Sequence, residues 1–174
     1  GEIVAKLNAL VDPTIIEALY AASQAGVRVQ LNIRGVCCLR PGVKGLSENI
    51  TVVSSVDRFL EHARVVYFRQ GGNPKIFISS ADWMPRNLDR RIELLVPVLD
   101  PKCAEKLGHI LHCYFRDQSN AWSMDSNGKY LRPERSAKSY RVQHQLYETA
   151  KAAALAERNL NQGQFQPHLP KADH

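Results

Sequence analysis

The first 35 residues constrain the fold more than any other part of the chain, because they predict a strand–helix–strand unit. The segment "EIVAKLNAL" (2–10) alternates apolar and polar residues, as a half-buried strand does. In "DPTIIEALYAASQAG" (12–26), Asp12 is placed to cap a helix that Gly26 closes. The segment "VRVQLNIRG" (27–35) alternates again. Two such strands lie parallel in one sheet and are joined by a right-handed crossover.

The remaining segments complete an α/β domain, for which we expect a mixed sheet flanked by helices. The "GGN" at 71–73 is typical of a hairpin turn, and 57–62 predicts a short turn or helix. We expect one domain over residues 1–160 and a frayed, polar tail over 161–174. The additional strands are predicted at 50–56, 63–68, 75–79 and 91–99, and the additional helices at 100–117 and 136–159.

Three segments of the expected sheet direct candidate ligand-binding residues to one edge. Arg34 lies at the carboxyl end of the second predicted strand, and "SSADW" (79–83) lies at that of the fifth. Ligands of α/β sheets sit at the carboxyl ends of the strands. His62 begins the fourth strand instead. It shares this edge only if the fourth strand runs opposite to the others.

Positive charge is concentrated in the middle of the chain. The net charge is +6, and the window from Arg28 to Arg91 holds eleven Lys and Arg against five Asp and Glu. Outside this window the two kinds of charge are equal at twelve each. Such a window favours an anionic partner such as phosphate, nucleotide or nucleic acid, although a solvated basic face has the same composition.

The cysteines and the hydropathy of the chain limit which classes of protein it can belong to. The four cysteines include no CxxC pair, which favours small buried side chains in a reduced, cytoplasmic compartment. His109 and His112 are three residues apart on a predicted helix, but no Cys or acidic third ligand is near, so we expect no metal site. No apolar run approaches the roughly 20 residues that span a bilayer.

Because the chain begins at Gly1 in strand-like sequence, we expect it to be part of a longer protein.

The basic window contains the side chains that phosphoryl transfer needs. Arginine forks match phosphate oxygens, and a histidine can exchange a proton near neutral pH or be phosphorylated itself. Neither GxxxxGK[ST] nor GxGxxG is present, so a nucleotide has to be held by side chains. A purely structural histidine and a solvated run of arginines remain alternatives. The candidates are His62, Arg34, Arg58, Arg64, Arg86, Arg90 and Arg91.

Four sequence blocks together resemble the C-terminal catalytic region of the long-chain polyphosphate kinases. They are "LNALVD…IIEALYAASQAGV", "IRGVCCLRPGVKGLSENI", "RFLEHARVVYF" and "SSADWMPRNLDRRIEL", and the likeness covers about residues 3 to 133. The resemblance implies a phospholipase D-like fold. It also implies reversible transfer of the terminal phosphate of ATP to polyphosphate, with Mg²⁺ and a phosphohistidine.

The resemblance also implies roles for individual residues. Arg34 binds the nucleotide phosphates, His62 contacts the nucleotide as acid or base, and Arg64 is a further ATP- or phosphate-binding residue. Arg58, Arg86 and Arg90 are candidate polyphosphate contacts.

The chain departs from the phospholipase D pattern at two positions, which argues against phosphodiester hydrolysis. A phospholipase-type phosphodiesterase has Lys two residues after the histidine and Asp seven after it, where this chain has Arg64 and Arg69. The family carries its phosphohistidine and Mg²⁺ ligands on a preceding domain, so we expect half of an active site that is inactive alone. The expected partners are ATP or ADP, polyphosphate, the remaining domains of the polypeptide and further copies in a homo-oligomer. The full-length enzyme is expected in the cytoplasm, with peripheral membrane association left open.

Two other functions stay open. One is a phospholipase D-like phosphodiesterase or nuclease. The other is a module that binds polyanions by charge alone. No specific nucleic-acid partner is expected, because exposed aromatic residues do not interleave with the basic residues of the window.

Overall fold

The computed structural model describes residues 1–72, 74–134 and 139–161. The chain divides into two compact units, Gly1–Val142 and Gln143–His174. The predicted tail falls outside the described residues from position 162 on. A single domain over 1–160 stays a prediction.

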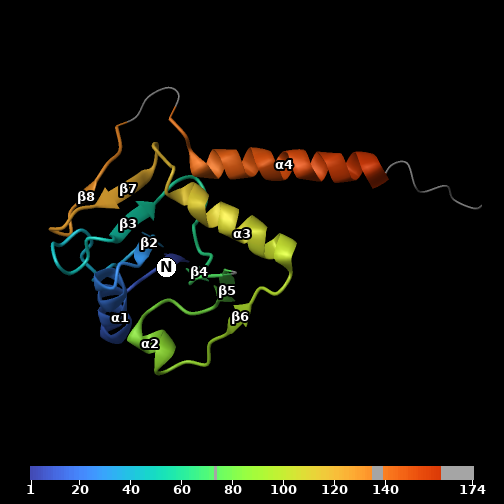
Figure 1. The fold of residues 1–174 in the computed structure, drawn as a ribbon. Coiled ribbons are helices and arrows are strands. Elements are labelled where there is room, and N and C mark those ends of the chain that lie inside the picture. The colour runs from blue at the N-terminus through green and yellow to red at the C-terminus, as the bar shows by residue number, and fades with distance from the viewer. Residues whose placement is uncertain (73, 135–138, 162–174) are drawn as a thin grey trace, which may run out of the picture. The chain divides into compact units, whose positions relative to one another are not determined.

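The first unit is built on one eight-stranded mixed sheet (Figure 1). Its order is β6-β5-β4-β1-β2-β3-β7-β8. The three strands β1, β2 and β3 are parallel, and every other neighbouring pair is antiparallel. The strands are β1 (Glu2–Leu7), β2 (Arg28–Ile33), β3 (Ile50–Ser55), β4 (Val65–Arg69), β5 (Lys75–Ser79), β6 (Leu95–Pro97), β7 (Ala121–Met124) and β8 (Tyr130–Leu131).

Two longer helices of this unit begin in the same way, at an Asp-Pro pair. Asp12 Oδ1 accepts a hydrogen bond from the Ile15 N–H at 2.9 Å at the start of α1. Asp100 Oδ1 accepts one from the Cys103 N–H at 2.8 Å at the start of α3. The carboxylate thus satisfies a backbone donor that has no partner within the helix. The helices are α1 (Pro13–Gln24), α2 (Pro85–Leu88), α3 (Pro101–Tyr114) and α4 (Val142–Asn161), the last lying mostly in the second unit.

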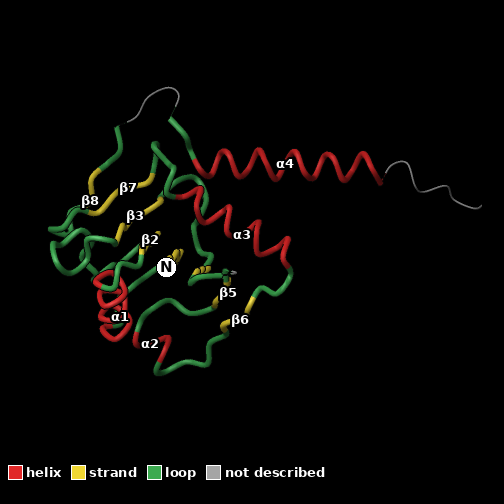
Figure 2. The backbone as a smooth tube through the Cα atoms, in the orientation of Figure 1, coloured by secondary structure: helices red, strands yellow, loops and turns green. Residues whose placement is uncertain are grey.

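The core consists of one apolar cluster on each face of the sheet, with α1 on one side and α3 on the other (Figure 2). Alternation along β1 explains this, because Ala5 and Leu7 pack toward Leu19 of α1 while Val4 packs toward Leu111 of α3. Each of these buried valine and leucine side chains contributes about 1.5–3 kcal/mol to the free energy of unfolding. Lys6 follows the same alternation and therefore lies on the α3 face.

Several predicted elements differ from the observed ones. β6 covers only three of the nine residues predicted at 91–99, whereas residues 57–59 form a bend, in line with the turn rather than the helix expected at 57–62. The Glu93 side chain bonds to Ser80 and Asn87, which holds the residues before β6 out of the ladder. β7, β8 and the short α2 were not predicted.

The cysteines and the last helix also differ in part from the predictions. All four cysteines are free, but only Cys113 is buried, while Cys38 and Cys103 are exposed. The expectation that all four are buried is therefore wrong. The helix α4 begins at Val142 and not at 136, and residues 136–138 lie outside the described part.

Candidate functional site

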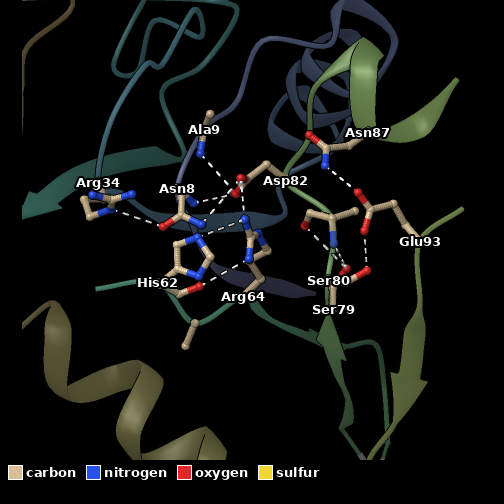
Figure 3. A network of polar contacts seen from close by, with 12 residues as sticks. Asn8, Ala9, Arg34, His62, Arg64, Ser79, Ser80, Asp82, Asn87 and Glu93 are labelled. Atoms are coloured by element: carbon tan, nitrogen blue, oxygen red, sulfur yellow. Dashed lines mark hydrogen bonds and ion pairs between the residues drawn. The ribbon is translucent and has the colours of Figure 1, made fainter. Parts of the chain in front are cut away.

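The candidate site lies at one edge of the sheet, where β1, β2 and β5 end and β4 begins (Figure 3). β4 runs antiparallel to both β1 and β5. β4 thus runs opposite to β1, β2, β3 and β5, as His62 needs in order to share their edge, although β6 runs in the same direction as β4. The segment before β4 therefore meets the segments that follow β1, β2 and β5.

Arg34 is held at this edge by the backbone and the side chain of Asn8. Its Nε donates to Asn8 Oδ1 at 3.1 Å, and the Gly35 N–H donates to the Asn8 carbonyl at 2.8 Å. A Cβ at position 35 would lie 3.0 Å from that same carbonyl oxygen. Glycine thus allows the chain after β2 to approach the chain after β1 closely, which brings the Arg34 guanidinium to the site.

His62 and Arg64 enter the site from the other direction, ahead of β4. Arg64 Nη2 lies 3.5 Å from His62 Nε2, and Arg64 Nη1 lies 3.4 Å from the His62 carbonyl oxygen. The imidazole is exposed, whereas Arg64 is largely covered. Among the atoms of the described residues, the buried Nε of Arg64 has no hydrogen-bond partner. A solvent-facing imidazole therefore stands beside a fixed guanidinium.

Asp82 connects the segments that form the edge. Its carboxylate accepts from the Asn8 N–H at 2.7 Å and from Arg64 Nη2 at 2.9 Å. It also accepts from the Ala9 N–H at 3.3 Å. Burial acts to raise the pKa of Asp82, but the hydrogen bonds from Arg64, Asn8 and Ala9 outweigh burial and lower it. Asp82 is therefore an anion that orients Arg64, and the sequence analysis did not assign it a role.

A second group of contacts fixes the loop that carries Asp82. Ser80 Oγ donates to the Glu93 carboxylate, and Asn87 Nδ2 donates to Glu93 Oε1 at 2.6 Å. The Leu94 N–H in turn donates to Ser80 Oγ at 2.9 Å. The hydrogen bonds from Ser80 and Asn87 lower the pKa of Glu93. The "SSADW" loop is thus bonded through Asp82 to the segment after β1 and through Ser80 to the segment before β6.

Arg34 differs from Arg64 in its charge balance. Arg64 is paired with Asp82. Within residues 1–72, 74–134 and 139–161, no ion pair involves Arg34 or His62. Arg34 therefore retains an uncompensated positive charge next to the exposed imidazole, which suits an anionic ligand such as a phosphate group.

Within the described residues, the other arginines of the basic window make no hydrogen bond or ion pair with Arg34, His62, Arg64 or Asp82. Arg58 lies over the Phe59 ring, with its guanidinium carbon 5.5 Å from the ring centroid. Arg69 lies at the opposite end of β4, where it pairs with Glu2 at 3.1 Å. Arg86, Arg90 and Arg91 are exposed on or after α2, and Arg91 pairs with Glu93 at 3.9 Å.

The residues at this edge do not form a metal site. In the part of the chain that the structure describes, no three His, Cys, Asp or Glu side chains are grouped so as to hold a metal ion. Both oxygens of Asp82 already accept hydrogen bonds from Asn8, Ala9 and Arg64. The donor set therefore does not fit an Mg²⁺ ion held by this chain's own carboxylates.

The mixed sheet and its cationic edge together define an α/β domain suited to binding anionic groups. Residues 1–145 match the family model described as "Polyphosphate kinase C-terminal domain 2", and the chain belongs to this family. It is 58% identical over 172 residues to a polyphosphate kinase of Rhodopirellula baltica, covering 98% of this chain and 20% of that protein. It is 52% identical over 148 residues to a polyphosphate kinase of Prochlorococcus marinus, covering 84% of this chain and 21% of that protein.

A solved structure gives the same result for the fold. The crystal structure of polyphosphate kinase from Porphyromonas gingivalis matches with a TM-score of 0.83 at 42% sequence identity, covering 88% of this chain and 24% of that one. The expected fold class, a mixed sheet flanked by helices in the phospholipase D-like manner, is confirmed. The chain spans about a fifth of the length of the curated relatives it matches.

Proposed function

We propose that this domain supplies half of the active site of an ATP:polyphosphate phosphotransferase. The reaction moves the terminal phosphate of ATP reversibly to polyphosphate through a phosphohistidine outside this chain. The observation that supports this most strongly is the arrangement of Arg34, His62 and Arg64 around one edge of the sheet (Figure 3). The family membership supports the same activity.

Each of these side chains has a distinct task in the proposed reaction. Arg34 has no carboxylate partner among the described residues, so its guanidinium binds the phosphates of ATP or ADP. Arg64 is held by Asp82 and supplies positive charge at a fixed position. The exposed imidazole of His62 gives a proton to, or takes one from, the phosphate being transferred. Arg58, Arg86 and Arg90 remain proposed contacts of the polyphosphate chain, and the proposal assigns no residue here to Mg²⁺.

Mutagenesis in the full-length protein tests this function. His62→Ala should lower kcat for polyphosphate synthesis from ATP by roughly 10²-fold or more, because a positioned acid or base is lost. Arg34→Ala should lower kcat/KM by a comparable factor, because a charged phosphate contact is lost. His144→Ala and Arg158→Ala, both exposed on α4, are the matched controls and should keep normal turnover.

Normal turnover in His62→Ala and Arg34→Ala would contradict the assignment. Rapid hydrolysis of a chromogenic phosphodiester by the full-length protein would support the phosphodiesterase alternative instead.

We also propose a cytoplasmic location and an assembly with the remaining domains of the polypeptide and with further copies of it. The four free cysteines are consistent with a reduced compartment. No helix among the described residues is long and apolar enough to span a membrane.

A further inference from the structure

Lys6 is a buried cation behind the candidate site. It lies on the α3 face of β1, and its side chain is only 3% exposed. Taking an ammonium group out of water is costly unless ion pairing and hydrogen bonds compensate it. The question is which contacts compensate Lys6, and what those contacts hold in place.

The contacts of Lys6 lie on both sides of His62 in the sequence. Its Nζ forms an ion pair with Glu61 Oε2 at 3.2 Å and donates to the Ala63 carbonyl at 3.2 Å. Tyr114 of α3 adds a third component, because its hydroxyl donates to the same Glu61 oxygen at 2.8 Å. The ammonium also lies 5.5 Å from the centroid of the Tyr114 ring.

The protonation states suit these bonds. Burial lowers the pKa of Lys6, the Glu61 carboxylate opposes this, and the nearby Arg34 and Arg64 lower it further. Burial and the Glu61 carboxylate raise the pKa of Tyr114, so its hydroxyl remains a donor at neutral pH. The effect of Arg34 and Arg64 on Lys6 also shows that Lys6 lies within electrostatic reach of the candidate site.

The segment that Lys6 and Tyr114 contact has little regular structure of its own. Residues 60–64 belong to no helix or strand. Their backbone bonds include His62 N–H to the Leu60 carbonyl at 3.1 Å and Ser79 N–H to the Arg64 carbonyl at 3.0 Å. The bonds from Lys6 and Tyr114 anchor residues 61 and 63, so the position of His62 between them depends on both.

We propose that Lys6, Glu61 and Tyr114 form a clamp that positions His62 for phosphoryl transfer. Lys6 and Tyr114 are positioning residues, since Lys6 is covered and directs its bonds to Glu61 and Ala63, and Tyr114 directs its hydroxyl to Glu61. This inference rests on the role proposed for His62. Because a small displacement of a reacting group costs rate more than affinity, loss of the clamp affects kcat and leaves the affinity for ATP intact.

Kinetics of the full-length protein test the clamp. Tyr114→Phe removes one hydroxyl from a side chain that otherwise stays packed, and it should lower kcat roughly tenfold with KM for ATP within about twofold. Lys6→Met should lower kcat by roughly 10²-fold, and the double variant should be no worse than Lys6→Met alone. Tyr67→Phe makes the same chemical change in a second buried tyrosine that packs in the α3-side cluster, and it should behave as wild type.

Hydrogen exchange in the same variants provides a readout that does not depend on turnover. Amides of residues 60–64 should exchange at least about tenfold faster in Tyr114→Phe and Lys6→Met, and not in Tyr67→Phe. If His62→Ala is inactive while Tyr114→Phe and Lys6→Met keep wild-type kcat and exchange, the clamp is overturned and the proposed function stands. Faster exchange at 60–64 with full activity in every variant, His62→Ala included, would overturn the proposed function and the positioning role with it.

Discussion

Among single residues, Asp82 does most to organise the candidate site. It accepts hydrogen bonds from the segment after β1 and from Arg64 ahead of β4, while it follows β5 itself. Only 4% of the residue is exposed. Three chain segments therefore depend on one buried carboxylate, and its removal leaves Arg64 without its counter-ion.

Asp82→Asn should destabilise the protein and change its response to acid. Breaking a buried ion pair by removing one partner costs about 3–5 kcal/mol of unfolding free energy at neutral pH. The pKa of Asp82 is lowered in the folded state, so the stabilisation is present above the ordinary pKa of about 3.9 and is lost as the pH falls through the folded-state pKa. The difference between wild type and Asp82→Asn in urea unfolding should therefore shrink below about pH 4.

The exposed Asp89 provides the control for this experiment, since Asp89→Asn removes the same charge from the surface after α2. Equal losses of stability in the two variants would contradict the role given to Asp82.

How far the site could be predicted depends on how far apart its contacts lie in sequence. Arg34 and His62 could be singled out as candidates because Arg34 follows one recognisable strand, His62 precedes another, and both lie within blocks that resemble the family. Asp82 binds Asn8 across 74 positions, and Lys6 binds Ala63 across 57. Such contacts follow from the order of the strands, which local sequence does not encode.

Among the helices and strands, the local units were predicted best. The β1–α1–β2 unit has its Asp cap, its alternation and its parallel pairing as expected. β7 has only four residues and pairs with β3 from a distant part of the chain, so no local pattern marks it. β6 was predicted too long because the apolar run of 91–99 is typical of a strand, whereas only residues 95–97 pair, at the sheet edge, where Leu95 and Val96 lie exposed.

The two Asp-Pro helix starts make a matched pair for a stability test. Asp12→Ala should reduce the free energy of unfolding by about 1 kcal/mol, and Asp100→Ala should also reduce it, because each change leaves a backbone N–H at the helix start without its acceptor. Glu17→Ala removes an exposed carboxylate from the interior of α1 and should change the stability by less than about 0.5 kcal/mol. Urea unfolding measures all three, and equal effects would show that charge, and not capping, matters.

For the molecule as a whole, the charge pattern separates a specific site from a general affinity for polyanions. The excess of Lys and Arg lies between Arg28 and Arg91, which includes Arg34, His62 and Arg64. A polyanion-binding surface would lose a similar affinity whichever exposed cation is removed. A specific site instead loses affinity only when one of the cations that line it is removed.

Binding of tripolyphosphate to the full-length protein should distinguish the two. Affinity should fall by about tenfold between about 50 and about 300 mM salt, because the attraction is screened. At either salt concentration Arg34→Ala should weaken binding by about tenfold or more, while Arg158→Ala should have little effect. Isothermal titration measures both, and equal losses in the two variants would favour the polyanion-binding module.

The opposite direction of β4 also separates where this fold can vary in length from where it cannot. β4 leaves the edge of the candidate site at Val65 and β5 returns to it at Ser79, so the connection through Gly71 and Gly72 lies at the far end of both strands. A residue inserted into that turn would be absorbed before it reached the histidine or the aspartate. The same insertion between Ser79 and Asp82 would rotate the carboxylate away from its partners, so natural variation in loop length should collect at the turn and avoid the opposite edge.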